Sequence, residues 1–154
     1  MSGAAPGAKP TAASAAGNGV APRIALRDVR PSDREFLHRV YASTREEELA
    51  AVSWSREEKD AFVRMQFEAQ DAYYREHYAE ASFQVVLVDG EPAGRLYVAR
   101  WPAELRIVDI ALLPEHRGRG IGTALLEALI AEADAAGKPV SIHVEQYNPA
   151  RRLY

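Results

Sequence analysis

Arg117-Gly118-Arg119-Gly120-Ile121-Gly122-Thr123 stands between an apolar stretch, Leu105 to Leu113, and a helical pattern from Ala124 to Ala136. Glycine lets the backbone come close to a ligand because it carries no Cβ. The first N–H groups of the helix that follows have no partner within the helix. An apolar strand, a glycine-rich turn and a helix start, in this order, therefore predict a binding site for an anion such as a pyrophosphate.

The composition predicts one domain and excludes several classes of function. The chain has 154 residues and 47% hydrophobic content, enough for one packed core. Its formal net charge of -3 gives no basic field for nucleic acid. It has no cysteine, which excludes disulfides, thiolate zinc sites and cysteine nucleophiles and fits a reducing cytoplasm. No apolar run approaches the roughly 20 residues that span a bilayer, so we expect a soluble cytoplasmic protein.

The chain divides into a tail and a folded unit. Residues 1–22 are almost wholly Ala, Gly, Ser, Pro and Thr, with Lys9 the one charged side chain. Such a segment buries too little apolar surface to offset its ordering entropy, so we expect a disordered tail. Residues 23–154 are expected to form the single domain.

The first half of the domain predicts one strand and three helix starts. Residues 23–29 alternate polar and apolar side chains, as a strand does. Three capping boxes follow, in which a hydroxyl and a carboxylate three residues apart satisfy free N–H groups. They are Ser32 with Glu35, Thr44 with Glu47, and Ser55 with Glu58. The last begins a helix to about Tyr78, whose buried stripe is predicted as Val63, Phe67, Gln70, Tyr74 and Tyr78.

The second half predicts a hairpin, a central strand and a further helix and strand. Asp89-Gly90 is the preferred sequence for a two-residue hairpin turn, and it separates two apolar runs between Phe83 and Ala99. Leu105 to Leu113 is the central strand, and the helix after the glycines should end at Gly137. A last strand is expected at Val140 to Val144. The side chains expected to be buried on the helix are Ile121, Leu125, Leu126, Leu129 and Ile130.

Other nucleotide motifs fit the glycine run less well. A Rossmann fingerprint requires glycine where Thr123 stands, and its glycines follow the strand directly. A P-loop ends in Gly-Lys-Ser/Thr, which the chain lacks, and a kinase loop lies inside a hairpin. A dinucleotide-binding domain and a turn that binds nothing remain as weaker alternatives.

Two motifs resemble the Gcn5-related N-acetyltransferase (GNAT) family. Arg117-x-x-Gly120-x-Gly122 is similar to its acetyl-CoA signature, Arg/Gln-x-x-Gly-x-Gly/Ala, and residues 109–115 resemble the strand and turn before it. Residues 148–154, Asn-Pro-Ala-Arg-Arg-Leu-Tyr, are similar to the family's Asn…Ala…Leu-Tyr helix. The resemblance extends from about Arg23 to Tyr154. It implies an α/β fold of the α+β type, with a mixed, mostly antiparallel central sheet flanked by helices.

The resemblance also implies where acetyl-CoA binds. The pyrophosphate is held by main-chain N–H groups of the glycine loop, with two arginines available for charge-assisted contacts. A bulge in the central strand frees backbone groups for the pantetheine arm and the thioester carbonyl, where an N–H would stabilise the developing negative charge. The implied cofactor-binding residues are Ile110, Ala111, Leu112, Arg117, Gly118, Arg119, Gly120, Ile121, Gly122, Thr123 and Asn148.

Catalysis requires a base and an acid, for which the sequence offers four candidates. An alkylammonium has no lone pair, so an acceptor amine must lose a proton before it attacks. Candidate bases are His143 and Glu145 on the last strand and Glu104 at the start of the central strand; each is also interpretable as a solvated or satisfied polar residue. Tyr154 stands where the family places an acid for the leaving thiolate, and its alternative interpretation is aromatic packing.

The sequence thus predicts an N-acetyltransferase that transfers an acetyl group from acetyl-CoA directly to a primary amine. The acceptor is a small molecule or a protein or peptide amine; nucleic acid, membrane and metal are not expected. The alternative is a non-catalytic acyl-CoA-binding or regulatory module. The family continues beyond Leu-Tyr with two further strands that this sequence lacks, so the domain is expected to be incomplete at its C-terminal end. The last strand would then be an open edge that favours a homodimer.

Overall fold

The computed structural model describes residues 21–143, so most of the expected tail and residues Glu145, Asn148 and Tyr154 lie outside the described part. The elements in chain order are β1 (Ile24–Asp28), η2 (Pro31–Asp33), α1 (Arg34–Ala50), α2 (Arg56–His77), β2 (Ser82–Val88), β3 (Glu91–Arg100), β4 (Leu105–Leu112), η3 (Pro114–His116), α3 (Ile121–Ala135) and β5 (Val140–Ile142). None of the helices in this part is long and apolar enough to cross a membrane.

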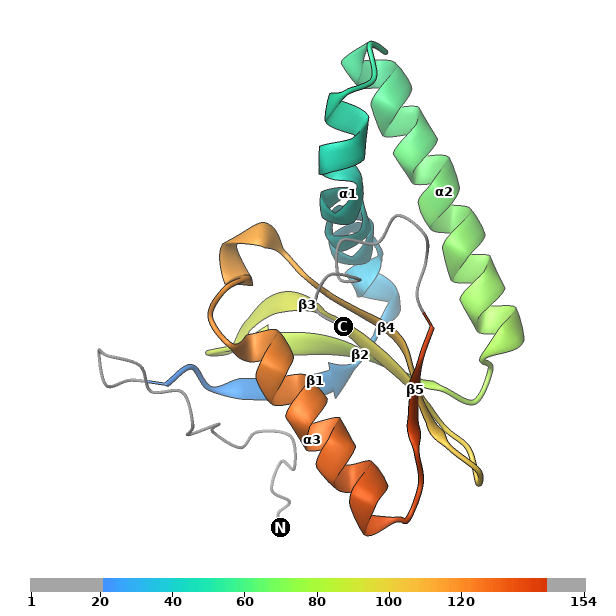
Figure 1. Ribbon diagram of the computed structural model, residues 1–154. Helices are drawn as coiled ribbons and strands as arrows, with labels where there is room; N and C mark the ends of the chain where they lie inside the picture. The colour runs from blue at the N-terminus through green and yellow to red at the C-terminus, as the bar shows by residue number, and fades with distance from the viewer. Residues whose placement is uncertain (1–20, 144–154) are drawn as a thin grey trace.

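The described strands form one mixed sheet in the order β1-β2-β3-β4-β5. The first four are antiparallel neighbours, and β5 pairs with β4 in parallel. Helix α3 covers one face of the sheet, while α1 and α2 lie on the other and extend beyond it as a helical hairpin (Figure 1). The expected α+β fold with a mostly antiparallel central sheet is confirmed.

Two local structures, a hairpin turn and a helix cap, form as the sequence predicts. Asp89 and Gly90 both have positive φ, 52° and 84°, as a two-residue hairpin turn requires. Ser55 caps α2: the Glu58 N–H donates to Ser55 Oγ at 3.1 Å, and the Ser55 N–H donates to Glu58 Oε1 at 2.8 Å. The five residues expected on the buried stripe of α2 are all buried.

Of the other two predicted helix starts, the one at Thr44 is wrong, and the one at Ser32 lies two residues before the start of α1, without the predicted cap. Thr44 lies inside α1, where its hydroxyl donates to the Tyr41 carbonyl at 2.7 Å. A hydroxyl can make this bond without interrupting a helix, so a cap motif alone does not mark a start. Ser32 falls within η2, and α1 begins after Asp33, whose carboxylate accepts from the Arg30 N–H at 2.7 Å.

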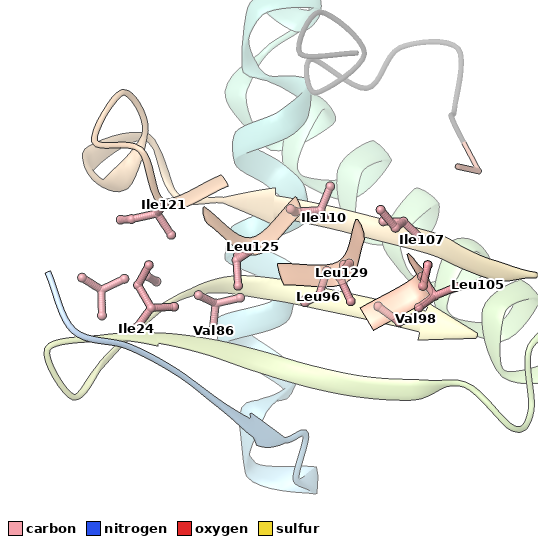
Figure 2. Close-up of a cluster of buried hydrophobic side chains, with 13 residues drawn as sticks. Ile24, Val86, Leu96, Val98, Leu105, Ile107, Ile110, Ile121, Leu125 and Leu129 are labelled. Carbon is pink, nitrogen blue, oxygen red and sulfur yellow. The ribbon is translucent and has the colours of Figure 1, made fainter. Parts of the chain in front are cut away.

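The face covered by α3 holds the largest apolar core. Helix α3 contributes Ile121, Leu125, Leu129 and Ala133, spaced four residues apart. Figure 2 shows side chains of this cluster against the sheet, with parts of the chain in front cut away. Ile130 was expected to be buried but is 48% exposed, because it lies about 100° around the helix from Leu129. Leu126 is partly buried against the cluster, and Gly137 ends the helix region with a φ of 71°, as predicted.

Candidate functional site

The glycine loop presents main-chain amides at the start of α3. Gly118 and Gly120 have φ values of 74° and 81°, conformations that side chains disfavour. The first backbone hydrogen bond of the helix runs from the Ala124 N–H to the Gly120 carbonyl at 3.0 Å, and no side chain caps the helix. The N–H groups of residues 121–123 therefore precede the helical hydrogen-bond ladder and are oriented to bind an anion.

Strand β4 carries one residue more than its partner β3. Tyr97 pairs with Asp109 and Val98 pairs with Ile107, which leaves Val108 without a partner on β3. Val108 packs in the cluster with Tyr74 and Tyr97, so it lies on the same face as Asp109. This is a β-bulge, which bends the strand and changes the direction of the main-chain groups that follow.

Beyond the bulge, the N–H and C=O groups of successive residues of β4 point alternately toward β3 and toward the side on which β5 lies. The Ala111 carbonyl lies against Gly94 of β3, only 2.2 Å from where a Cβ on that glycine would stand. Because the peptide is trans, the Leu112 N–H points the opposite way, toward the side of β5. The Leu113 N–H donates to the Ala93 carbonyl at 2.8 Å, so the Leu112 carbonyl also points toward that side. Ile110, two residues earlier in the regular ladder, shares this direction.

In the described part of the chain, strand β5 pairs with only the first part of β4. Its register joins Leu105 to Val140 and Ile107 to Ile142, and the His143 N–H donates to the Ile107 carbonyl at 2.8 Å. Residues 108–112 have no β5 partner among residues 21–143. We call this side of residues 108–112, unpaired within residues 21–143, the open side of β4; it is followed along the chain by η3 and the glycine loop.

The two arginines of the loop differ in their contacts. Arg117 donates from Nε to the Leu112 carbonyl at 2.9 Å and from Nη2 to Ser43 Oγ on α1 at 3.2 Å. Both arginines are exposed, but Arg119 contacts only a neighbour in the described part of the chain: its Nη1 lies 3.3 Å from His116 Nδ1.

A buried polar network lies under α2, and sequence reasoning missed it. Arg95 of β3 donates to both carboxylate oxygens of Asp109, at 3.2 and 2.9 Å, and to Gln70 Oε1 at 2.8 Å. The Tyr74 hydroxyl donates to Asp109 Oδ2 at 2.7 Å. A lone Arg and a lone Asp inside two apolar strands were the available signal, since the hairpin places them on one face.

The buried Arg95 guanidinium and the Asp109 carboxylate form an ion pair, at 2.9 Å. Burial is the largest single influence and would lower the pKa of Arg95, but the attractions of Asp109, Tyr97 and Tyr74 and the hydrogen bond to Asp109 together raise that pKa above its ordinary value. Burial raises the pKa of Tyr97, whose hydroxyl has no hydrogen-bond partner among the described residues. Both groups therefore keep their protons at neutral pH.

The structure places two of the four candidate catalytic residues, and they differ. His143 directly follows β5. Its Nδ1 lies 3.4 Å from the Tyr78 hydroxyl, and its ring lies 6.0 Å from that of Tyr74 and 5.9 Å from that of Tyr78. Glu104 immediately precedes β4, three residues from the Ile107 that His143 contacts; it is paired with Arg106 at 3.2 Å and accepts from the Ser141 hydroxyl at 3.0 Å. The part of the chain that the structure describes contains no cluster of three His, Asp or Glu side chains suited to a metal ion.

The acetyltransferase (GNAT) family model matches residues 37–154, well over half of the chain. The protein therefore belongs to the GNAT acetyltransferase family.

The curated relatives match over a shorter region. The chain is 42% identical to the mycothiol acetyltransferase of Clavibacter sepedonicus over 64 residues, which are 42% of this chain and 20% of that protein. It is 38% identical to the mycothiol acetyltransferase of Nocardiopsis dassonvillei over 61 residues, 40% of this chain and 18% of that protein. The chain thus matches about a fifth of the length of these relatives.

Solved structures share the fold across most of the chain. The PaiA N-acetyltransferase of Thermoplasma acidophilum, in complex with coenzyme A, aligns with a TM-score of 0.57 at 17% identity, covering 84% of each chain. An acetyltransferase of Thermus thermophilus aligns with a TM-score of 0.55 at 24% identity, covering 84% of this chain and 81% of that one.

Proposed function

We propose that this protein is an acetyl-CoA-dependent N-acetyltransferase that transfers the acetyl group directly to a primary amine within a ternary complex. The observation that carries the proposal is that two sets of main-chain groups are continuous: the N–H groups of the glycine loop and those on the open side of β4. The amides of the glycine loop stand at the end of the open side of β4, so one extended molecule reaches both. Membership of the GNAT family supports acetyl-CoA as that molecule.

In this proposal, the backbone binds the two ends of acetyl-CoA. The N–H groups of the glycine loop hold the pyrophosphate, which suits a helix start without a side-chain cap. The N–H groups of Ile110 and Leu112 face the open side of β4 and bind the pantetheine arm and the thioester carbonyl. An N–H fixed beside that oxygen stabilises the negative charge that forms when the amine attacks.

Among the described candidates, His143 is the base that the geometry favours. Its N–H donates to the Ile107 carbonyl, so it lies level with a residue three positions before Ile110, about 10 Å along the strand. Its Nδ1 is 3.4 Å from the Tyr78 hydroxyl, a neutral contact that leaves Nε2 for a proton. Glu104 is six residues before Ile110, about 20 Å along the strand, and its carboxylate is already paired with Arg106. Asp109 is closer, but Arg95 and Tyr74 occupy both of its oxygens.

The proposed reaction removes two protons from the nitrogen and delivers one to the sulfur. His143 takes the first proton from the ammonium and passes it to solvent; the amine then attacks the thioester carbon, and the nitrogen, cationic after the attack, loses its second proton to His143. The C–S bond breaks as the carbonyl re-forms, and the coenzyme A thiolate accepts a proton from Tyr154, the proposed donor, which solvent then reprotonates. Glu145 as a second base and Asn148 as a cofactor contact also remain proposals, since these three residues lie outside the described part of the chain.

The test is transfer with a matched pair of histidine variants. The purified 154-residue chain is incubated with acetyl-CoA and a panel of small amines, amino acids and peptides, and free thiol and acetylated product are both measured. His143→Gln should lower kcat roughly 10²- to 10⁴-fold, the usual contribution of a general base, and leave the Kd of coenzyme A unchanged. His77→Gln is the control, because His77 is an exposed neighbour that stacks on Tyr73 at 4.0 Å.

Two outcomes would replace this function with another. Thermal stabilisation by acetyl-CoA without any turnover would favour a non-catalytic acyl-CoA-binding module. Stabilisation by NAD and not by coenzyme A would favour a dinucleotide-binding domain. Equal activity of the His143 variant and the wild type would remove His143 from the mechanism.

A further inference from the structure

Arg117 connects three parts of the proposed acetyl-CoA site. Its backbone belongs to the turn before the glycine loop, its Nε donates to the Leu112 carbonyl at the end of β4, and its Nη2 donates to Ser43 Oγ on α1. Ser43 is 7% exposed, and its hydroxyl donates to the Val40 carbonyl at 2.7 Å. The Ser43 proton is therefore committed to α1, and its lone pairs face Arg117.

The carbonyl that Arg117 holds belongs to a residue of the binding surface. The Leu112 carbonyl and N–H both point to the open side of β4, as the contacts of Ala111 with Gly94 and of Leu113 with Ala93 require. A charge-assisted hydrogen bond to the carbonyl fixes the orientation of the residue that carries it. Fixing Leu112 in this way also fixes the N–H that the proposed function assigns to acetyl-CoA.

Arg119 has no comparable anchor in the described part of the chain. Its guanidinium meets the ring of His116, a neighbour in the same loop, and the residues on either side of it are glycines that leave the backbone accessible. An exposed guanidinium beside free amides meets a phosphate without breaking a structural contact. The two arginines of the loop thus differ in what their side chains already do.

We propose that Arg117 is a positioning residue, a clamp that joins β4, the glycine loop and α1, and that Arg119 is the loop arginine that contacts phosphate. This inference rests on the proposed function for the identity of the ligand. It differs from the expectation that both guanidinium groups bind the pyrophosphate. The guanidinium of Arg117 acts through Leu112, not on the ligand.

Charge-conserving substitution separates a clamp from a phosphate ligand. Lysine keeps the charge but lacks the fork that spans Leu112 and Ser43. Arg117→Lys and Arg117→Met should therefore both raise the Kd of coenzyme A about tenfold, and raise the Kd of S-acetylpantetheine, which has no phosphate, by a similar factor. Arg119→Met should weaken coenzyme A alone and reduce the salt dependence of its binding. Wild-type affinity in Arg117→Lys, or tighter binding in Arg117→Met, would overturn the clamp.

A second measurement does not depend on coenzyme A. Amide hydrogen exchange of Leu113, whose N–H donates to Ala93 beside the clamped carbonyl, should become about tenfold faster in Arg117→Met and remain unchanged in Arg119→Met. Ser43→Ala alone should accelerate the exchange of Leu113 less than Arg117→Met does. Added to Arg117→Met, it should cause no further acceleration, because the two side chains form one contact. Unchanged exchange in Arg117→Met would refute the inference even if coenzyme A binds. Absence of coenzyme A binding by the wild type would instead refute the proposed function.

Discussion

The two faces of the sheet differ in the interactions that bury them. The face under α3 is a single cluster of apolar side chains, with no charged member. On the other side, two smaller apolar clusters lie between the helices and the sheet and a third lies between α1 and α2, and the Arg95 and Asp109 ion pair is buried there too. Apolar burial is non-directional, whereas a buried ion pair requires fixed geometry. Both faces therefore contribute to stability, and the ion pair on the second face also constrains the position of β4 against β3.

Breaking the buried ion pair should give the largest effect. Asp109→Ala leaves Arg95 charged and unpaired at 2% exposure, which should cost about 3–5 kcal/mol in the free energy of unfolding, measured by urea denaturation. The double variant Arg95→Met/Asp109→Leu removes both charges and should recover most of this loss. A double variant as unstable as the single one would contradict the comparison between the faces.

A smaller effect is expected on the α3 face. Leu129→Ala removes a side chain that is 5% exposed from the apolar cluster and should cost about 3 kcal/mol. Ile130→Ala is the matched control on the same helix, and its cost should stay within about 1 kcal/mol because Ile130 is 48% exposed. Equal melting temperatures for the two variants would show that α3 packs in another orientation.

The smallest effect should come from the surface of the α3 face. Arg100 donates to both oxygens of Glu132, at 2.6 and 3.0 Å, and this hydrogen bonding holds the pKa of Glu132 below its ordinary value of 4.5. The pair therefore stabilises the fold above pH 4.5, and the contribution disappears as the pH falls through the lowered pKa. Glu132→Gln should cost at most about 1 kcal/mol near pH 7 and nothing near pH 2. A cost that persists in acid would rule out the ion pair as its origin.

The sequence predicts the elements whose signals are local. Asp89-Gly90 predicts its hairpin turn and Ser55 with Glu58 predicts its cap, because neighbours in sequence make these contacts. Thr44 misleads because its hydroxyl binds within the helix, and only the packing of α1 on the sheet decides between the two uses. The glycine loop was predicted for the same local reason as the turn and cap.

The contacts between distant residues could not be predicted from local patterns. Asp109 and Arg95 meet because a hairpin register places them on one face, and Tyr74 reaches them from a helix 35 residues away in sequence. Arg117 and Ser43 are separated by 74 residues. The contact of Tyr74 with Asp109 and that of Arg117 with Ser43 both depend on how α1 and α2 lie on the sheet, which residue spacing does not encode.

The bulge at Val108 has a consequence for how this site changes as the sequence varies. The N–H groups of Ile110 and Leu112 point away from β3 because β4 has one residue more than β3 at the bulge, which reverses the alternation of directions along the strand. Replacing a side chain in β4 leaves that count unchanged, whereas deleting one residue would turn the same amides into the sheet. The proposed binding edge thus depends on the number of residues in β4 and not on which side chains they carry, so it tolerates many substitutions.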